Sequence, residues 1–159
     1  MPRKVFFSFD FKRDARRVAQ VRNCRVVGFS ETPFLEAAAW ETVERGGDAA
    51  IQRWIDDNLH GSSVTVVLIG ATTASRKWVR YEIEQSYQRG NGLLGITLHH
   101  INDPLTGKDV AGPNPFTNAK DSRGQSLSYS VPIYDWIMDD GRANISRWIE
   151  AAAFKAGCL

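Results

Sequence analysis

The segment from Val64 to Ile69 (Val-Thr-Val-Val-Leu-Ile) is the feature that most constrains how this 159-residue chain can fold. Its apolar residues run almost without alternation, which is typical of a strand buried on both faces of a parallel sheet. The segment before it, from Asp48 to Leu59, is amphipathic, with Ile51, Ile55 and Leu59 spaced as on one face of a helix. A buried strand beside an amphipathic helix indicates an α/β protein.

Four further runs have the character of strands, and helical patterns separate them. The expected strands are residues 5–9, 24–29, 64–69, 93–98 and 131–136. The expected helices are residues 10–22, 34–45, 48–59, 76–89 and 144–156. Asp14 is expected to cap the first helix and Asp48 the third. Because strands and helices alternate, we predict a flavodoxin-like, doubly wound parallel sheet of five strands in the order 2-1-3-4-5, with helices on both faces.

A long polar connection interrupts this regular pattern. Residues 99–130 are rich in Gly, Pro and Asn, and so long a connection in a compact domain is usually functional or mobile. The length of the chain fits one domain, spanning residues 1–159. With 43% apolar residues, the chain has enough material to fill one core.

Charge and composition argue against several classes of partner. The chain carries 20 basic and 18 acidic residues, a formal net charge of +2, so no broad field favours nucleic acid or a membrane surface. We find neither a secretory signal nor an apolar stretch of the ~20 residues that a membrane span needs, and we expect a cytoplasmic protein. Cys24 and Cys158 fit no metal or disulfide pattern. The pair His99-His100 lacks a third ligand nearby in the sequence, so no metal site is predicted.

In a sheet of the predicted order, ligands bind where strands one and three diverge at their carboxyl ends. Two segments should meet there: Ser8-Phe9-Asp10 after strand one, and residues 70–82 after strand three. The sequence contains neither the Gly-x-Gly-x-x-Gly of dinucleotide-binding Rossmann proteins nor a Walker A loop. A phospho-receiver would need an aspartate where Ile69-Gly70 stands, and the loop after strand one is unlike the phosphate loop of flavin mononucleotide proteins.

Two stretches resemble the TIR (Toll/interleukin-1 receptor-like) family. Residues 3–10 (Arg-Lys-Val-Phe-Phe-Ser-Phe-Asp) resemble the first TIR box, an apolar strand that ends in a serine–aromatic pair. Residues 78–82 (Trp-Val-Arg-Tyr-Glu) resemble the Trp-Cys-x-x-Glu helix, with Val79 where cysteine is usual. A serine is also usual two positions before the tryptophan, and here that position is Arg76. Residues 20–23 and 76–83 look more closely like the TIR-like proteins of the bacterial Thoeris anti-phage defence system.

The resemblance implies an enzyme of the NAD glycohydrolase or ADP-ribosyl cyclase type. Catalytic TIR domains cleave the nicotinamide–ribose bond of NAD with a glutamate on this helix, and Glu82 inherits that role. Ser8, Phe9, Asp10 and Trp78 inherit substrate-binding places around it. NAD is then a substrate, and no resident cofactor is expected. Thoeris TIR proteins make a cyclic ADP-ribose-type signal that diffuses to a separate effector. Residues 29–35 correspond to the loop through which TIR domains self-associate, so the resemblance also allows a homo-oligomer.

A carboxylate suits this chemistry, because breaking the N-glycosidic bond builds positive charge on the ribose ring. Trp78 and Glu82 stand four residues apart and share a helix face. Val79, Ile83 and Tyr87 form the neighbouring apolar stripe, which should pack on the sheet and leave Glu82 partly sheltered. Partial burial would strengthen the electrostatic effect of its charge.

Structural explanations compete with each of these functional ones. A helical glutamate is usually solvated, Ser8 can satisfy backbone groups at a strand end, and Asp10 can cap a helix or form a turn. The basic residues 12–13 and 16–17 fit a solvated helix face or a phosphate contact. Two alternative functions therefore remain beside the enzyme: a non-catalytic TIR-like signalling and oligomerisation module, and a nucleotide sensor that binds without turnover.

Overall fold

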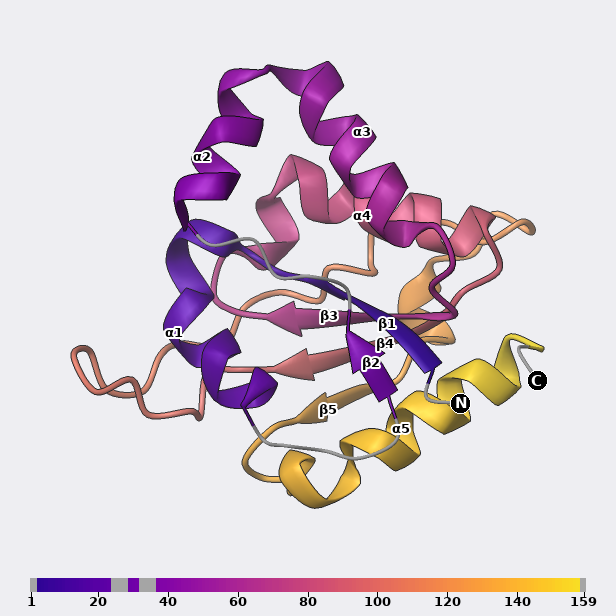
Figure 1. Ribbon diagram of the computed structural model, residues 1–159. Coiled ribbons are helices and arrows are strands. Elements are labelled where there is room, and N and C mark those ends of the chain that lie inside the picture. The colour runs from indigo at the N-terminus through magenta and orange to yellow at the C-terminus, as the bar shows by residue number, and fades with distance from the viewer. Residues whose placement is uncertain (1–2, 24–28, 32–36, 158–159) are drawn as a thin grey trace.

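The computed structural model describes residues 3–23, 29–31 and 37–157 (Figure 1). The strands are β1 (Arg3–Ser8), β2 (Phe29–Glu31), β3 (Val64–Ile69), β4 (Gly92–Thr97) and β5 (Ile133–Asp135). The α-helices are α1 (Phe11–Arg22), α2 (Ala37–Arg45), α3 (Asp48–Leu59), α4 (Lys77–Gln88) and α5 (Gly141–Lys155). Two short 3-10 helices are η1 (Thr73–Ser75) and η2 (Leu127–Tyr129).

The strands form one parallel sheet, so the predicted α/β class is confirmed. Its hydrogen-bonded order is β2-β1-β3-β4-β5. All six residues of β3 are buried, as expected of a central strand with helices on both faces. β2 and β5 are three-residue edge strands. Residues 24–28 of the predicted second strand and 34–36 of the predicted second helix lie outside the described residues.

Helices cover both faces of the sheet, in two layers (Figure 1). On one side, α1, at the left in that view, and α5, at the bottom, share an apolar cluster: Val18 and Val21 pack with Ile145, Ile149 and the inward residues of β1, β3 and β4. On the other side, α3 packs on Phe6, and α4 packs on the other face of β3. Because side chains alternate along a strand, each central strand feeds both layers of core.

Two predicted helix N-caps are wrong, because other residues occupy the cap positions. The N-cap of α1 is Asp10, whose Oδ1 accepts a bond from the backbone N–H of Arg13 at 3.4 Å, while Asp14 lies in the first turn and is buried. The residue before α3 is Gly47, whose φ of 81° favours glycine, and Asp48 is already helical. In each case the cap stands earlier in the chain than the predicted aspartate.

The long segment between β4 and β5 is ordered by packing as well as by hydrogen bonds. It buries apolar side chains at both ends, among them Ile101, Phe116 and Leu127. It also contains two isolated antiparallel bridges, Asp103 with Gly107 and Lys120 with Ser126. The segment predicted as an irregular insertion is therefore anchored to the domain at several points.

Candidate active site

Strand alternation and helix packing bring Ser8 and Glu82 to the same layer. In β1, Phe6 and Ser8 point to the side covered by α3 and α4, because they are two residues apart. α4 is fixed over β3 by a buried polar contact, in which the hydroxyls of Ser86 and Thr65 lie 2.7 Å apart. Ser86 also donates to the backbone carbonyl of Glu82 at 2.6 Å. These contacts fix the position of Glu82 relative to the carboxyl end of β1.

Glu82 is sheltered, as its place beside the apolar stripe predicts: it is 7% exposed, while Val79 and Ile83 are buried. Burial raises the pKa of Glu82 from 4.5 to about 8, and the nearby Ser8 hydroxyl lowers it in part. The two groups nevertheless stop short of hydrogen-bond geometry. Within the described part of the chain, Oγ of Ser8 and Oε2 of Glu82 are both buried without a partner. Two facing buried polar groups with unused bonding capacity are a feature of binding and catalytic sites.

Asp10 holds together the two loops that meet at the carboxyl edge of the sheet. Its Oδ2 accepts a bond from Oγ1 of Thr72 at 3.0 Å and from Nε of Arg76 at 2.6 Å. Asp10 is 6% exposed, so these charge-assisted bonds are partly shielded from water. The arrangement ties the start of α1 to the start of α4. Arg76, the residue that departs from the TIR pattern, thus has a structural role as a partner of Asp10. The sequence pattern did not predict this role.

Phe9 and Trp78 flank this region from different layers. Phe9 is partly buried against the α1–α5 core and stacks on Phe11 with ring centroids 5.7 Å apart. Trp78 packs against the α3 core and meets Tyr81 edge to face at 5.6 Å, with Nζ of Lys77 4.8 Å above its ring. Both rings are thus held in place by neighbours. The substrate-binding roles of Ser8, Phe9, Asp10 and Trp78 remain predictions.

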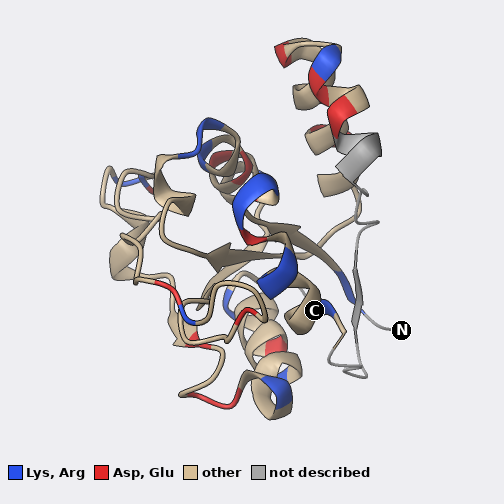
Figure 2. Cartoon of the chain, turned by 90° about the vertical axis from the view of Figure 1, so that its left-hand side faces the viewer, with Lys and Arg blue, Asp and Glu red and all other residues tan. Residues whose placement is uncertain are grey.

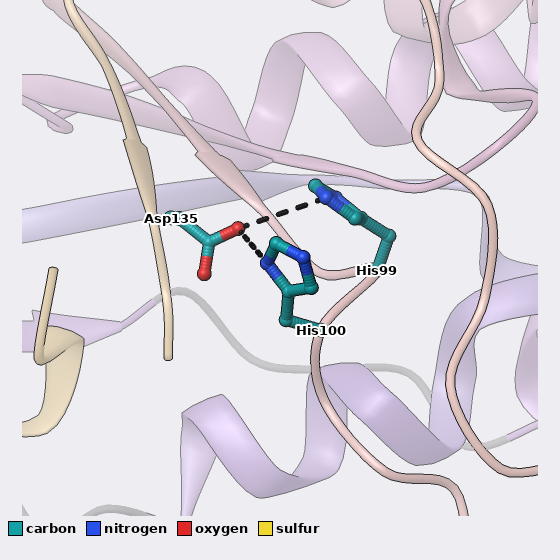
Figure 3. A group of neighbouring side chains, drawn as sticks. All are labelled: His99, His100 and Asp135. Carbon is teal, nitrogen blue, oxygen red and sulfur yellow. Dashed lines mark hydrogen bonds and ion pairs between the residues drawn. The ribbon is translucent and has the colours of Figure 1, made fainter. Parts of the chain in front are cut away.

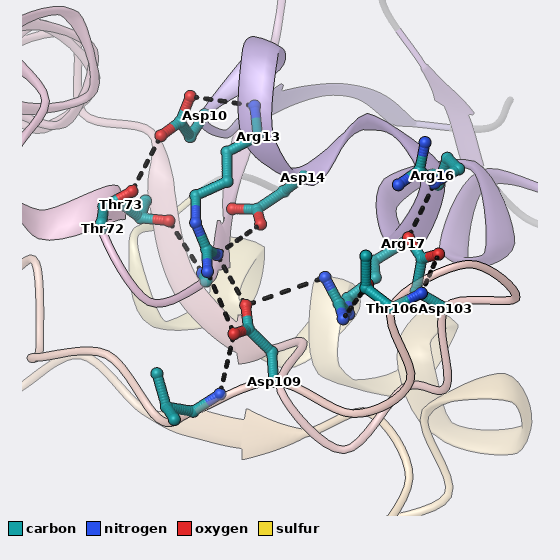
Figure 4. A network of polar contacts seen from close by, with 12 residues as sticks. Asp10, Arg13, Asp14, Arg16, Arg17, Thr72, Thr73, Asp103, Thr106 and Asp109 are labelled. Carbon is teal, nitrogen blue, oxygen red and sulfur yellow. Dashed lines mark hydrogen bonds and ion pairs between the residues drawn. The ribbon is translucent and has the colours of Figure 1, made fainter.

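Of the four basic residues near the start of α1, Lys12, Arg13 and Arg16 are exposed, as a solvated face predicts, and Arg17 is buried. Lys12 lies 3.4 Å from Glu44. Figure 4 shows the three arginines beside acidic residues of the segment after β4. Arg13 makes two bonds to Asp109, at 2.6 and 3.0 Å, and Arg16 binds Asp103 at 2.8 Å. The bonds from Arg13 hold the pKa of Asp109 down at about 2. The pairs fasten the first part of the long segment along α1.

Arg17 is the buried member of this group, at 5% exposure. It donates to the carbonyls of Ile101 at 3.2 Å and Gly107 at 2.8 Å, and its Nη1 lies 3.7 Å from Asp109. We expect Arg17→Met to destabilise the protein by about 2–4 kcal/mol, because the carbonyls and the carboxylate lose a donor that a thioether cannot replace. Denaturant unfolding measures the change.

The control for this substitution is Arg80→Met. Arg80 lies on α4 and makes an exposed ion pair at 3.7 Å with Glu84, one turn further along that helix. Such pairs contribute less than about 1 kcal/mol. Equal loss of stability in the two variants would contradict the structural role given to Arg17.

The segment also reaches the candidate site. A side chain at Gly112 would lie 2.0 Å from the carbonyl oxygen of Gly70, so the backbone of the segment crosses directly over the exit of β3. Gly70 itself leaves no room for a side chain, because the Asp14 carboxylate packs against it at 2.1 Å from an added Cβ. The two glycines therefore permit three stretches of chain to converge where β1 and β3 end.

Other surfaces of the described chain are less suggestive of this chemistry. A pocket of about 240 Å³ lies between the second half of α4 and residues 118–127, and none of the five candidate residues lines it. Basic and acidic residues are interspersed along the carboxyl edge, which faces the viewer in Figure 2. None of the described helices combines the length and the apolar character that a membrane span requires.

One grouping contradicts a sequence expectation. His99 and His100 do have a third potential ligand: Asp135, whose Oδ2 lies 2.7 Å from Nδ1 of His100 (Figure 3). The sequence could have indicated this grouping by position, because His99 follows one predicted strand and Asp135 belongs to the next. Carboxyl ends of neighbouring parallel strands meet at one edge.

Comparison with known proteins agrees with the resemblance. The sequence profile described as "Thoeris protein ThsB, TIR-like domain" matches residues 6–103. A protein of Bacillus cereus (strain MSX-D12) named "Putative cyclic ADP-D-ribose synthase ThsB1" is 32% identical over 191 aligned positions, which cover 94% of this chain and the whole of that relative. The matched region includes Ser8, Glu82 and the loops that join at Asp10. This chain therefore belongs to the family of Thoeris ThsB proteins with a TIR-like domain.

Proposed function

We propose that this protein cleaves the nicotinamide–ribose bond of NAD and closes the remaining ADP-ribose into a cyclic signal, which activates a separate effector in anti-phage defence. The observation that carries the proposal is the buried carboxyl group of Glu82, near enough to the Ser8 hydroxyl for that hydroxyl to affect its pKa, at the carboxyl edge of the sheet. The name of the Bacillus cereus relative, a cyclic ADP-D-ribose synthase, supports the choice of reaction.

The environment of Glu82 fits the electrostatics of the reaction. Its pKa of about 8 reflects desolvation, and no charged side chain contributes to the rise. The nicotinamide ring of NAD is cationic, and as the glycosidic bond breaks the positive charge moves to the ribose. A carboxylate in a site poor in water stabilises such a charge more strongly than it would in bulk solvent. Nicotinamide leaves as a neutral molecule, so the site needs no strong general acid.

Ring closure in place of hydrolysis requires that water be kept from the ribosyl cation. We assign this task to residues 109–112; the assignment is supported by the bond from Arg13 to Asp109 and by the close approach of Gly112 to Gly70. These residues would cover the bound substrate. The same cover would favour a folded NAD in which the adenine end lies close to the ribose.

The direct test is incubation of the purified protein with NAD, with and without extract of phage-infected cells, followed by chromatography and mass spectrometry. Release of nicotinamide together with a product of the mass of ADP-ribose less one water supports the cyclase. Calorimetry with NAD and ADP-ribose runs in parallel, since binding without turnover in any condition would identify a nucleotide sensor. If the protein neither binds nor turns over these nucleotides, the remaining function is a non-catalytic signalling module.

The pH profile gives a second readout. Because the reactive form of Glu82 is the carboxylate and its pKa is about 8, kcat/KM for NAD should rise with pH and level off above about pH 8. Steady-state rates between pH 6 and 9 test this. A profile that is flat over the whole range would contradict the assignment of the ionised form.

A further inference from the structure

Three side chains converge at the carboxyl edge of the sheet, at the end of β5 and just after β4, on other elements of the fold than the Ser8–Glu82 pair. They are His99, His100 and Asp135, and one ligand atom from each lies within 4.8 Å of the others (Figure 3). Oδ2 of Asp135 is 2.7 Å from Nδ1 of His100 and 3.8 Å from Nε2 of His99. The two imidazole rings lie 4.0 Å apart, tilted by 44°. Two nitrogens and one oxygen are therefore gathered in one small region.

His99 is not explained by the hydrogen bonds of the fold. Its Nδ1 is buried and has no partner within the described part of the chain, and the 3.8 Å from Nε2 to Asp135 is beyond hydrogen-bonding distance. Nε2, the nitrogen on the side of Asp135, therefore keeps its bonding capacity for a ligand placed between the side chains. His100 is 39% exposed at its side chain, so an ion can reach the group from solvent.

The carboxylate of Asp135 is oriented in advance. Its Oδ1 accepts bonds from the backbone N–H groups of Ile137 at 2.9 Å and Met138 at 2.8 Å. Thr97 donates its hydroxyl to Oδ2 at 2.9 Å. Such outer contacts fix a ligating carboxylate and are a regular part of metal sites.

We propose that His99, His100 and Asp135 bind a divalent transition metal ion of the Zn²⁺ type, through Nε2, Nδ1 and Oδ2. Around a tetrahedral ion with bonds of about 2.0–2.1 Å, ligand atoms lie ~3.3 Å apart. The distances of 2.7 and 3.8 Å from Asp135 to the two nitrogens bracket that value. All three ligand atoms lie within 4.8 Å of one another, so the side chains draw together when the ion binds. Two imidazoles and a carboxylate suit Zn²⁺ or Co²⁺ and are a poor match for Mg²⁺ or Ca²⁺.

Binding requires a change of tautomer: the proton between Nδ1 of His100 and Asp135 gives way to the metal, and the neutral ring carries its single proton on Nε2. The fourth position is taken by water, which leaves the ion accessible to a further ligand. The ion would join the end of β4 to the end of β5. This proposal is independent of NAD chemistry.

The test uses the full chain, stripped of metal by a chelator, and titrates it with CoCl₂ while the visible absorption of Co²⁺ is recorded; ZnCl₂ then competes. We expect one Co²⁺ per chain, with the intense bands of four- or five-coordinate geometry, and displacement by Zn²⁺. His99→Ala and His100→Ala should each weaken binding by more than about tenfold, since loss of outer contacts alone costs about 10- to 100-fold. Asp135→Asn keeps the Oδ1 acceptor and should weaken it similarly.

The matched control is His60→Ala, which changes the third histidine of the chain, at the end of α3, and should leave Co²⁺ binding unchanged. Each variant is compared with the wild type by circular dichroism in chelator, so that a folding defect is recognised. Zn²⁺-soaked crystals of the wild type should show an anomalous peak between the three side chains. Absence of the Co²⁺ bands, no peak there, or equal binding by the wild type and a folded His100→Ala variant overturns the proposal.

Discussion

Replacement of Glu82 by glutamine is expected to slow nicotinamide release from NAD by about 100- to 1000-fold, the range for losing one preorganised electrostatic group in an active site. Glutamine has nearly the same shape as glutamic acid, so the packing beside Val79 and Ile83 should survive. What is lost is the ability to carry a negative charge while the ribose becomes cationic. Single-turnover measurement of nicotinamide release separates this loss from a change in NAD binding.

Glu84→Gln is the matched control. Glu84 lies on the same helix two residues further on, with its side chain 47% exposed in a pair with Arg80. The chemical change is identical, but the charge is in solvent and on the side away from Ser8. We expect this variant to retain the wild-type rate within about a factor of two, as for a surface substitution. If Glu82→Gln and Glu84→Gln turn over NAD equally well, Glu82 is not the catalytic carboxylate.

The pattern of this sequence predicts its architecture much better than its polar contacts. The buried run Val64–Ile69 and the stripe containing Val79 and Ile83 identify the layers, because burial of apolar residues has a simple periodicity. The shelter of Glu82 follows from its place next to that stripe.

Contacts between distant segments have no such periodicity. Arg17 reads as part of a basic, solvated helix face, and only the fold shows that residues 101–109 run beside it. The sequence pattern favours Asp14 as the cap of α1, but Asp10 also stands near the helix start, and the backbone geometry places the cap at Asp10. Asp135 is 35 positions away from His100. Such pairings depend on which strand ends meet, and this is a property of the whole sheet.

The same Glu82→Gln substitution should also make the protein more stable in alkaline solution. The pKa of Glu82 is raised in the folded state from 4.5 to about 8, so the folded protein holds this proton at pH values where the unfolded chain has released it. Stability must therefore fall as the pH rises from about 5, and the loss is complete above about pH 8. Glutamine stays neutral and avoids this loss, which amounts to at most about 5 kcal/mol at 1.36 kcal/mol per pH unit.

Urea unfolding of the wild type and the variant at pH 5 and at pH 9 measures this effect. At pH 5 the two proteins should have similar free energies of unfolding, and at pH 9 the variant should be the more stable by about 2–5 kcal/mol. Asp109 does not disturb the comparison, because its pKa of about 2 keeps it ionised in the folded protein at both pH values. Glu84→Gln should show no such divergence. A difference between Glu82→Gln and wild type that is the same at both pH values would mean that the Glu82 carboxyl group is solvated in the folded protein, and the electrostatic basis of the proposed reaction would be lost with it.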